Sequence, residues 1–126
     1  MRYLFDTNVF LYYLAGDLRI PRLFSKQFLN ENEVITSAIV RIELLSFSQL
    51  SHEEETAIRD MLDQFRVMPI TNEIEEMAID IRRKYRVRIP DAIIAATAYS
   101  TSSTLVTHDV KDFKRITSIR LYDPFA

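Results

Sequence analysis

Cysteine is absent from the 126-residue sequence, and its absence excludes several kinds of site at once. Without thiols the chain forms no disulfide, no thiolate zinc site, no iron–sulfur cluster and no cysteine nucleophile. Any metal ion must therefore be bound through oxygen or through the imidazole nitrogens of the two histidines. Oxygen ligands thus become the main candidates.

Long apolar runs and a marked excess of one charge are also missing. No stretch approaches the roughly 18 apolar residues of a membrane span, and residues 1–6 lack the features of a signal peptide. We therefore expect a cytoplasmic protein with no membrane partner. The net charge of −2 weighs against nucleic-acid binding, because proteins that bind nucleic acids usually carry an excess of basic residues.

Basic residues nevertheless gather in two segments, between residues 82 and 88 and between residues 111 and 115. In one interpretation they guide an RNA backbone, and this candidate set comprises Arg82, Arg83, Lys84, Arg86, Arg88, Lys111 and Lys114. In the other, residues 82–84 only end a helix, where cations complement the helix dipole. Charge alone leaves both interpretations open.

The composition predicts a folded, single-domain protein over residues 1–126. Hydrophobic residues make up 48% of the chain and there is only one glycine, whereas a disordered chain has fewer apolar residues and more net charge. The length falls in the commonest range for one domain with one hydrophobic core.

Short apolar segments alternate with segments of helical periodicity along the chain. We predict strands at 2–6, 33–36, 67–70, 104–107 and 119–122, and helices at 8–14, 21–30, 38–49, 51–65, 72–85 and 90–99. Strands joined by helical crossovers of this length lie parallel, so the sequence predicts an α/β protein with a largely parallel sheet. The segment 8–14 is apolar around its circumference, which predicts burial on several sides.

Four acidic residues fall at or beside predicted strand ends. Asp6 ends the first predicted strand and Asp109 comes just after the fourth, Glu43 lies in the helix after the second strand, and Asp91 opens the helix that leads into the fourth. In a parallel sheet these places converge on the carboxyl edge, where ligands bind. Crowded carboxylates repel one another, so a divalent cation is the natural means of keeping them ionised, and oxygen ligands favour Mg²⁺ or Mn²⁺.

Each of these acids also has a purely structural interpretation. Asp6 is a good helix N-cap, and Asp91 suits the first turn of a helix, where the dipole favours a negative charge. Glu43 lies between Ile39 and Phe47 on one helical stripe, where a carboxylate is costly unless it is paired, binds a metal ion or reaches solvent at the margin.

The quoted segments resemble the PIN-domain nucleases, and most closely the small VapC-type toxins of toxin–antitoxin pairs. The resemblance rests, in chain order, on Leu4-Phe5-Asp6-Thr7-Asn8, on Ser37 through Glu43-Leu44, on Ile89-Pro90-Asp91-Ala92, and on residues 104–109 with Asp112-Phe113. It implies a three-layer α/β/α sandwich with a mostly parallel sheet of four or five strands. It also implies a Mg²⁺-dependent endoribonuclease, in which Mn²⁺ can substitute.

The resemblance further implies roles for individual residues. Asp6 and Asp91 would be the main metal ligands, and Glu43 and Asp109 would complete the catalytic set. Supporting roles fall to Asn8, Thr107 and Asp112. Many toxins of this type carry Asn where this chain has Asp109, so either Asp109 or Asp112 is the fourth acid, and the other caps the short helical turn between them.

Partners are implied in the same way. They are an RNA substrate, a second copy of the chain in a homodimer, and a VapB-like antitoxin whose C-terminal segment places a basic side chain in the acidic pocket. An aromatic set is available for the antitoxin groove, or is simply core: Phe10, Tyr12, Tyr13, Phe24, Phe28 and Phe47. Two alternatives remain, a PIN-type nuclease of RNA processing without an antitoxin and a catalytically silent binding module.

Overall fold

A computed structural model describes all of residues 1–126. Five strands form one sheet in the order β3-β2-β1-β4-β5, and every neighbouring pair is parallel. The strands are β1 (Arg2–Phe5), β2 (Glu33–Ser37), β3 (Arg66–Met68), β4 (Thr104–Val106) and β5 (Arg120–Tyr122). The predicted parallel α/β fold is confirmed, and all five predicted strands belong to the sheet.

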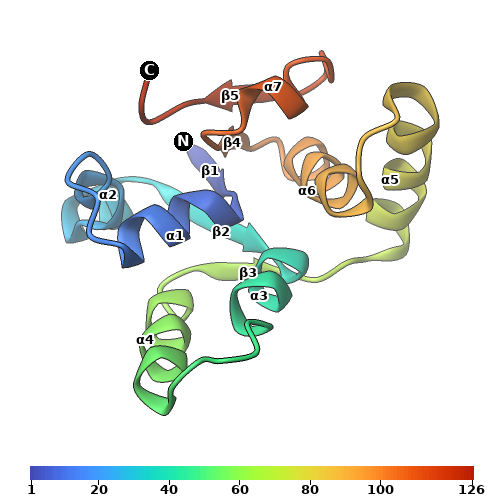
Figure 1. Ribbon diagram of the computed structural model, residues 1–126. Helices are drawn as coiled ribbons and strands as arrows, with labels where there is room; N and C mark the ends of the chain where they lie inside the picture. The colour runs from blue at the N-terminus through green and yellow to red at the C-terminus, as the bar shows by residue number, and fades with distance from the viewer.

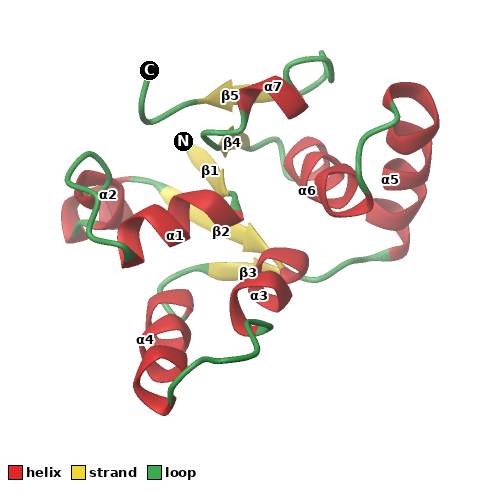
Figure 2. Ribbon diagram, in the orientation of Figure 1, coloured by secondary structure: helices red, strands yellow, loops and turns green.

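Helices cover both faces of this sheet. They are α1 (Thr7–Leu14), α2 (Lys26–Glu31), α3 (Ala38–Leu45), α4 (His52–Leu62), α5 (Asn72–Tyr85), α6 (Ile89–Ser100) and α7 (Val110–Phe113), with a short 3₁₀ helix at Pro21–Phe24. Figure 1 shows α1, α2 and α4 on one side of the sheet and α5 and α6 on the other, and Figure 2 shows the strands between these two layers. The arrangement is the expected α/β/α sandwich. None of the helices has the length and apolar character that crossing a membrane requires.

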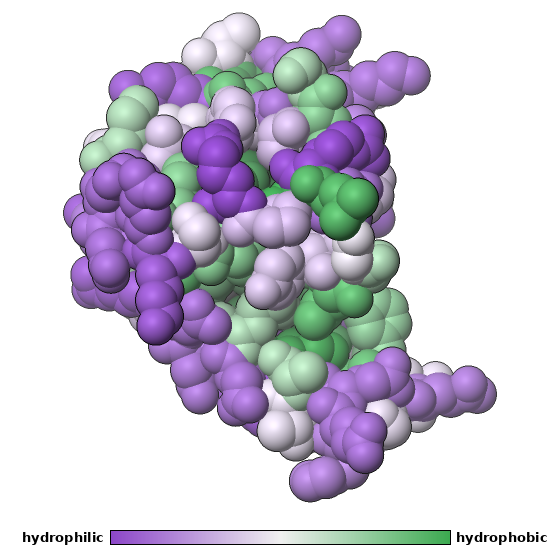
Figure 3. Space-filling view, turned by 90° about the vertical axis from the view of Figure 1, so that its left-hand side faces the viewer, coloured by the Kyte–Doolittle hydropathy of each residue, from purple (hydrophilic) through white to green (hydrophobic).

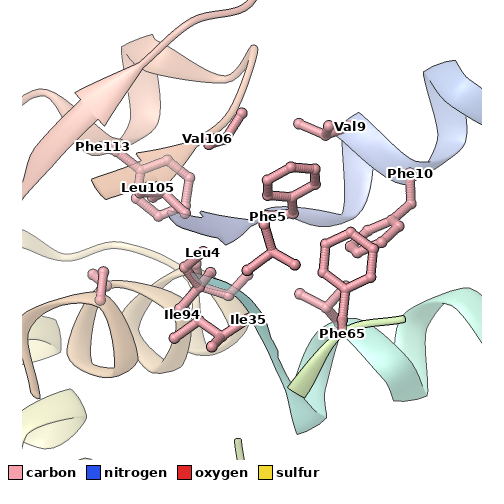
Figure 4. Close-up of a cluster of buried hydrophobic side chains, with 14 of the residues drawn as sticks. Leu4, Phe5, Val9, Phe10, Ile35, Phe65, Ile94, Leu105, Val106 and Phe113 are labelled. Atoms are coloured by element: carbon pink, nitrogen blue, oxygen red, sulfur yellow. The ribbon is translucent and has the colours of Figure 1, made fainter. Parts of the chain in front are cut away.

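The hydrophobic core holds the central strand β1 from both sides. Leu4 and Phe5 of β1 are fully buried. On one face the Phe5 ring lies 5.9 Å from the ring of Phe10 in α1 and 5.0 Å from that of Phe65, and Figure 4 shows these side chains together. Because parallel strands are usually buried on both faces, the residue that follows β1 starts from a rigid position.

The order of the strands reverses at β1. The chain passes from β1 to β2 and β3 on one side, and then returns across the sheet to β4 and β5 on the other. Ligands of open α/β sheets bind at such a reversal, beyond the carboxyl ends of the two strands that flank it. The ends of β1 and β4 are therefore the place in this fold where a site is expected.

Three predicted helix starts are present with their capping side chains. Ser37 accepts a hydrogen bond from the backbone of Ile39 at the start of α3, and Thr71 caps α5. Ser51 and Glu54 form a reciprocal capping box at the start of α4. The three predicted helix starts, at residues 38, 51 and 72, therefore agree with the structure to within one residue.

Several predicted helix bounds are wrong. The predicted helix 21–30 is interrupted at Ser25, whose extended backbone ends the 3₁₀ helix and whose hydroxyl caps α2. The predicted helix 38–49 ends at Leu45, and the next residue is its C-cap. The predicted helix 51–65 ends at Leu62. Serine side chains compete with helical backbone hydrogen bonds, which explains the interruption at Ser25.

The predicted burial of α1 on several sides is also wrong. Val9 and Phe10 are fully buried, but Leu11, Tyr13 and Leu14 are between 38% and 41% exposed. α1 lies in the outer layer and contacts α3 and the core along one side only. The helix therefore presents an apolar face to solvent.

Candidate active site

Asp6 ends the central strand and begins the candidate site. Its backbone N–H donates to the carbonyl of Val106 in β4 at 3.0 Å, so the strand pairing fixes the position of its Cα. Its carboxyl accepts hydrogen bonds from the backbone N–H of Thr7 at 2.8 Å, from the hydroxyl of Thr107 at 2.8 Å and from the amide of Asn8 at 3.3 Å. The structural role is present, because Asp6 is the N-cap of α1.

The Asp6 carboxyl is buried, with only 6% of the residue exposed. Burial raises its pKa to about 6, although the hydrogen bonds from Thr107 and Thr7 act in the opposite direction. Repulsion by the carboxyls of Asp91 and Glu43 raises this pKa further. The three acids are therefore close enough to interact electrostatically, and an added positive charge would favour their ionised forms.

Thr107 and Asn8 hold this carboxyl from two sides. The Thr107 hydroxyl, directly after β4, also accepts hydrogen bonds from the Asn8 amide at 3.2 Å and from the backbone N–H of Asp109 at 2.9 Å. The Asn8 carbonyl oxygen in turn accepts from the backbone N–H of His108 at 3.2 Å. The network joins the ends of β1 and β4 and fixes the orientation of the Asp6 side chain.

Glu43 reaches the same region from α3. Its carboxyl accepts a hydrogen bond of 2.7 Å from the hydroxyl of Thr7, and the residue is half-buried. The predicted stripe of Ile39, Glu43 and Phe47 does not form, because α3 ends before Phe47, which is 50% exposed. Thr7 belongs to the first motif, residues 4–8, but no role in the site was predicted for it. The signal was present, since Thr7 stands between two polar residues directly after a buried strand.

Asp91 lies in the first turn of α6 and is also only 6% exposed. Burial raises the pKa of its carboxyl, and Asp112 and Glu43 raise it further. The guanidinium of Arg88 acts in the opposite direction and forms an ion pair of 3.4 Å with this carboxyl. Asp91 therefore has one positive partner among several negative neighbours.

The two candidates for the fourth acid occupy different places. Asp112 in α7 lines a cavity of about 270 Å³ together with Asp91. Asp109 is the exposed residue before α7, and its pKa is raised by burial first and by the neighbouring Asp112 carboxyl second. Asp112 thus faces the Asp91 side of the pocket, and Asp109 faces Asp112. Of the two candidates for the cap of this helical turn, Asp109 stands at the N-cap position of α7 but makes no side-chain capping hydrogen bond.

The predicted RNA-guiding residues divide into two groups. Arg86 and Arg88 line the cavity beside Asp91, and so does Arg115, which the candidate set did not include. The exposed Arg82, Arg83 and Lys84 form the last turn of α5, where their positive charges complement the helix dipole, and Lys111 and Lys114 are exposed outside the cavity lining. The cavity is therefore lined by two carboxyls and three guanidiniums, and Asp6 and Glu43 are not part of its lining. Hereafter the acidic pocket means the group of acids at this edge of the sheet, Asp6, Glu43, Asp91, Asp109 and Asp112.

The donor chemistry of the pocket suits a hard divalent cation. Two buried carboxyls, Asp6 and Asp91, have raised pKa values, and a cation at carboxylate oxygens stabilises their ionised forms. No three acidic or histidine side chains are placed so that they could hold one ion together. Hydrogen bonds hold Asp6, and the guanidinium of Arg88 holds Asp91. The donors fit such an ion in kind, and side-chain movement would be needed to bring them together.

Comparison with known proteins places this geometry in a family. The family model described as "PIN domain" matches residues 3–118. Ribonuclease VapC1 of Haemophilus influenzae (strain R2866) is 28% identical, and the match covers 98% of each chain.

Solved structures give the same result. A chain of a toxin–antitoxin complex from Klebsiella pneumoniae is 29% identical, with a TM-score of 0.79 over 97% of each chain. A chain of VapBC-1 from nontypeable Haemophilus influenzae is 25% identical, with a TM-score of 0.84 over 100% of each chain. Because the family model spans nearly the whole sheet and every residue of the acidic pocket, the chain belongs to the PIN-domain family.

Proposed function

We propose that this protein is an endoribonuclease that hydrolyses RNA phosphodiesters with a Mg²⁺ or Mn²⁺ ion bound at the acidic pocket. The observation that carries the proposal is the pair of buried carboxyls, Asp6 and Asp91, at the reversal of strand order. Similarity to a protein named Ribonuclease VapC1 supports the choice of RNA as substrate.

The residues of the pocket would have different roles in this reaction. Asp6 and Asp91 hold the cation, and Thr107 and Asn8 keep the Asp6 carboxyl oriented. Glu43, held by Thr7, and the Asp109/Asp112 pair add negative charge around the cation. When bound, such an ion polarises water and offsets charge on the phosphate. Because water is the attacking group, we expect products with 5′-phosphate and 3′-hydroxyl ends.

The proposal is tested with purified protein and a labelled RNA. We expect internal cleavage with Mg²⁺ or Mn²⁺, no cleavage with EDTA, and loss of cleavage in Asp6→Asn and Asp91→Asn. The matched control is Asp60→Asn, an exposed acid of α4 that is not part of the pocket. Cleavage by the Asp6→Asn/Asp91→Asn double variant at the wild-type rate would contradict the proposal.

We also propose an antitoxin as partner, which makes the chain the toxin of a toxin–antitoxin pair. The support is that its structural neighbours include chains of toxin–antitoxin complexes. We expect growth arrest when the protein is expressed alone in a bacterium, and normal growth with Asp6→Asn. Arrest by both forms would show that toxicity does not depend on nucleolysis. The homodimer stays a prediction, which light scattering of the purified chain tests.

The surface offers a place for that partner beside α1. A groove of about 520 Å³ lies between α1 and α4, and most of its lining is hydrophobic: Leu11, Leu14, Ala15, Phe47, Gln49, Leu50, Glu54, Ala57 and Ile58. Figure 3 shows hydrophobic side chains on this side of the molecule, bordered by hydrophilic ones. We propose that the antitoxin segment lies in this groove, hereafter the α1–α4 groove.

The groove differs from the aromatic one predicted from the sequence. Phe10 is fully buried, and Phe24 and Phe28 pack in the core cluster. Of the six aromatic residues, only Tyr13 and Phe47 are more than a third exposed, and only Phe47 lines the groove. The remaining apolar lining comes from both helices and from the segments that follow α1 and precede α4: Leu11, Leu14, Ala15, Leu50, Ala57 and Ile58.

A further inference from the structure

Arg88 is the one basic side chain that forms an ion pair with an acid of the pocket. The protein has four ion pairs between arginines and carboxylates, and only that of Arg88 with Asp91 involves a pocket carboxyl. Asp91, Asp112 and Glu43 all raise the pKa of the guanidinium, in that order. Arg88 therefore lies in the negative field of three acids from α6, α7 and α3.

We propose that Arg88 is a built-in counterion that competes with the divalent cation for the carboxyl of Asp91. This inference rests on the proposed function, because it assumes that the pocket binds a cation. Arg88 would pair with Asp91 in the cation-free protein, and cation binding would release the guanidinium toward solvent.

The geometry makes the ion pair easy to exchange. The Arg88 side chain is 71% exposed, and its single contact with Asp91 is long, at 3.4 Å between Nε and Oδ2. Although Arg88 is the N-cap residue of α6, its side chain makes no capping hydrogen bond. Release of the guanidinium therefore breaks one weak charge pair and leaves the helix and its packing intact.

A released guanidinium would also be available to bind a phosphate of the substrate at the same place. Arg86 and Arg115 line the cavity beside Arg88, so the freed side chain would join two other basic groups. Arginine matches the geometry of a phosphate, and a phosphate bound next to the cation would supply the negative partner that Asp91 no longer provides. Cation binding would thus turn Arg88 from a partner of the pocket into a partner of the substrate.

The inference is tested by measuring Mn²⁺ binding to the cation-free protein by titration calorimetry, without RNA. We compare the wild type with Arg88→Gln and with Arg86→Gln, a matched control that removes the same charge from the same cavity without breaking the ion pair. If the ion pair withholds Asp91 most of the time, Arg88→Gln binds Mn²⁺ with a Kd about three- to ten-fold lower than that of the wild type. Arg86→Gln stays within about two-fold of the wild type, since it changes only the screened field.

The possible outcomes distinguish failure of the proposed competition from failure of the proposed function. Equal Mn²⁺ affinities for Arg88→Gln and Arg86→Gln would overturn the competition while leaving the proposed function in place. Absence of Mn²⁺ binding in all three proteins would overturn the proposed function and the competition with it. Binding by Arg88→Gln alone would support the competition in its strongest form. Thermal unfolding of each cation-free protein confirms that the variants are folded.

A second measurement separates the two uses of Arg88. We measure binding of a non-cleaved RNA analogue in Mn²⁺, where Arg88→Gln should bind about three- to ten-fold more weakly than the wild type, because one phosphate contact is lost. Arg88→Lys, which keeps the charge, should recover part of that loss. Weaker Mn²⁺ binding in Arg88→Gln would contradict the inference, since it would show that Arg88 supports the cation rather than competing with it.

Discussion

The hydroxyl of Thr107 donates a hydrogen bond of 2.8 Å to the carboxyl of Asp6, a residue 101 positions earlier in the chain. The bond joins the ends of the two strands that flank the reversal of strand order. Among the interactions of the Asp6 carboxyl it lowers the pKa most, against the larger effect of burial. The acidity of the central carboxyl therefore depends on a side chain from the last third of the sequence.

Replacing Thr107 with Val should move the pH dependence of cleavage upward. The substitution removes the hydroxyl, so the pKa of Asp6 rises above about 6 and a higher pH is needed to ionise it. Rates measured from pH 5 to 9 at a Mg²⁺ concentration below saturation, where the proton and the cation compete for the Asp6 carboxyl, should reach half their maximum at a higher pH than in the wild type. Thr107→Ser, which keeps the hydroxyl, should stay close to the wild-type profile. Identical profiles for all three proteins would show that Asp6 ionisation does not control the rate.

The stability of the cation-free protein should fall as the pH rises through about 6. The pKa of Asp6 is raised from 3.8 to about 6 in the folded state, so folding favours the protonated carboxyl. The contribution is fully present below pH 3.8 and is lost as the pH passes 6. The shift corresponds to about 3 kcal/mol of unfolding free energy.

Asp6→Asn isolates this effect, because asparagine does not ionise. We expect the unfolding free energy of the variant, relative to the wild type, to rise by about 2.5 kcal/mol between pH 4 and pH 7.5 in EDTA, because part of the full effect lies below pH 4. Urea unfolding at each pH measures it. A constant difference across this range would mean that the folded-state pKa of Asp6 is not raised.

Thr7→Val should reduce cleavage more than it reduces stability. Thr7 donates the 2.7 Å hydrogen bond that holds the Glu43 carboxyl, and without it the carboxylate loses its fixed position. We expect the cleavage rate to fall about ten-fold, which corresponds to the roughly 1.4 kcal/mol of one charge-assisted hydrogen bond. Thr7→Ser should retain most of the activity. A large drop in melting temperature with unchanged activity would instead assign this bond a purely structural role.

Leu14→Glu should abolish binding of the antitoxin and leave RNA cleavage intact. Leu14 is 41% exposed and lines the α1–α4 groove, away from the acidic pocket. A buried, unpaired carboxylate in an apolar contact costs several kcal/mol, which is enough to prevent association. Co-purification with the co-expressed antitoxin measures the effect. The control is Tyr99→Glu, on an exposed part of α6 outside this groove, and equal loss in both variants would remove the groove from the proposal.

The sequence predicted the position of the site because the relevant signals are local. Asp6 directly follows a short apolar segment, and Thr107 follows another, so the parallel fold alone brings them to one edge of the sheet. Helix starts could be predicted equally well from the sequence, because capping by Ser37, Ser51 and Thr71 involves residues only two or three positions apart.

The remaining features depend on contacts between distant segments. The stripe predicted through Glu43 required α3 to continue to Phe47, but the helix ends at Leu45. The open face of α1 could not be predicted, because periodicity shows which side chains are apolar and not which of them find a neighbour. The spacing of three residues between Arg88 and Asp91 is visible in the sequence. That Asp112 and Glu43 also raise the pKa of the Arg88 guanidinium depends on the fold, which brings these distant segments together.

The central place of β1 has a consequence for the growing polypeptide during synthesis. A chain emerging from the ribosome presents β1 first, yet its neighbour β4 begins only at Thr104. Until that segment emerges, Asp6 lacks both the strand beside it and the hydroxyl that orients it. Such distant pairings form late. A nascent chain that has not yet reached β4 therefore cannot assemble the pocket, whatever part of the sheet it has already formed.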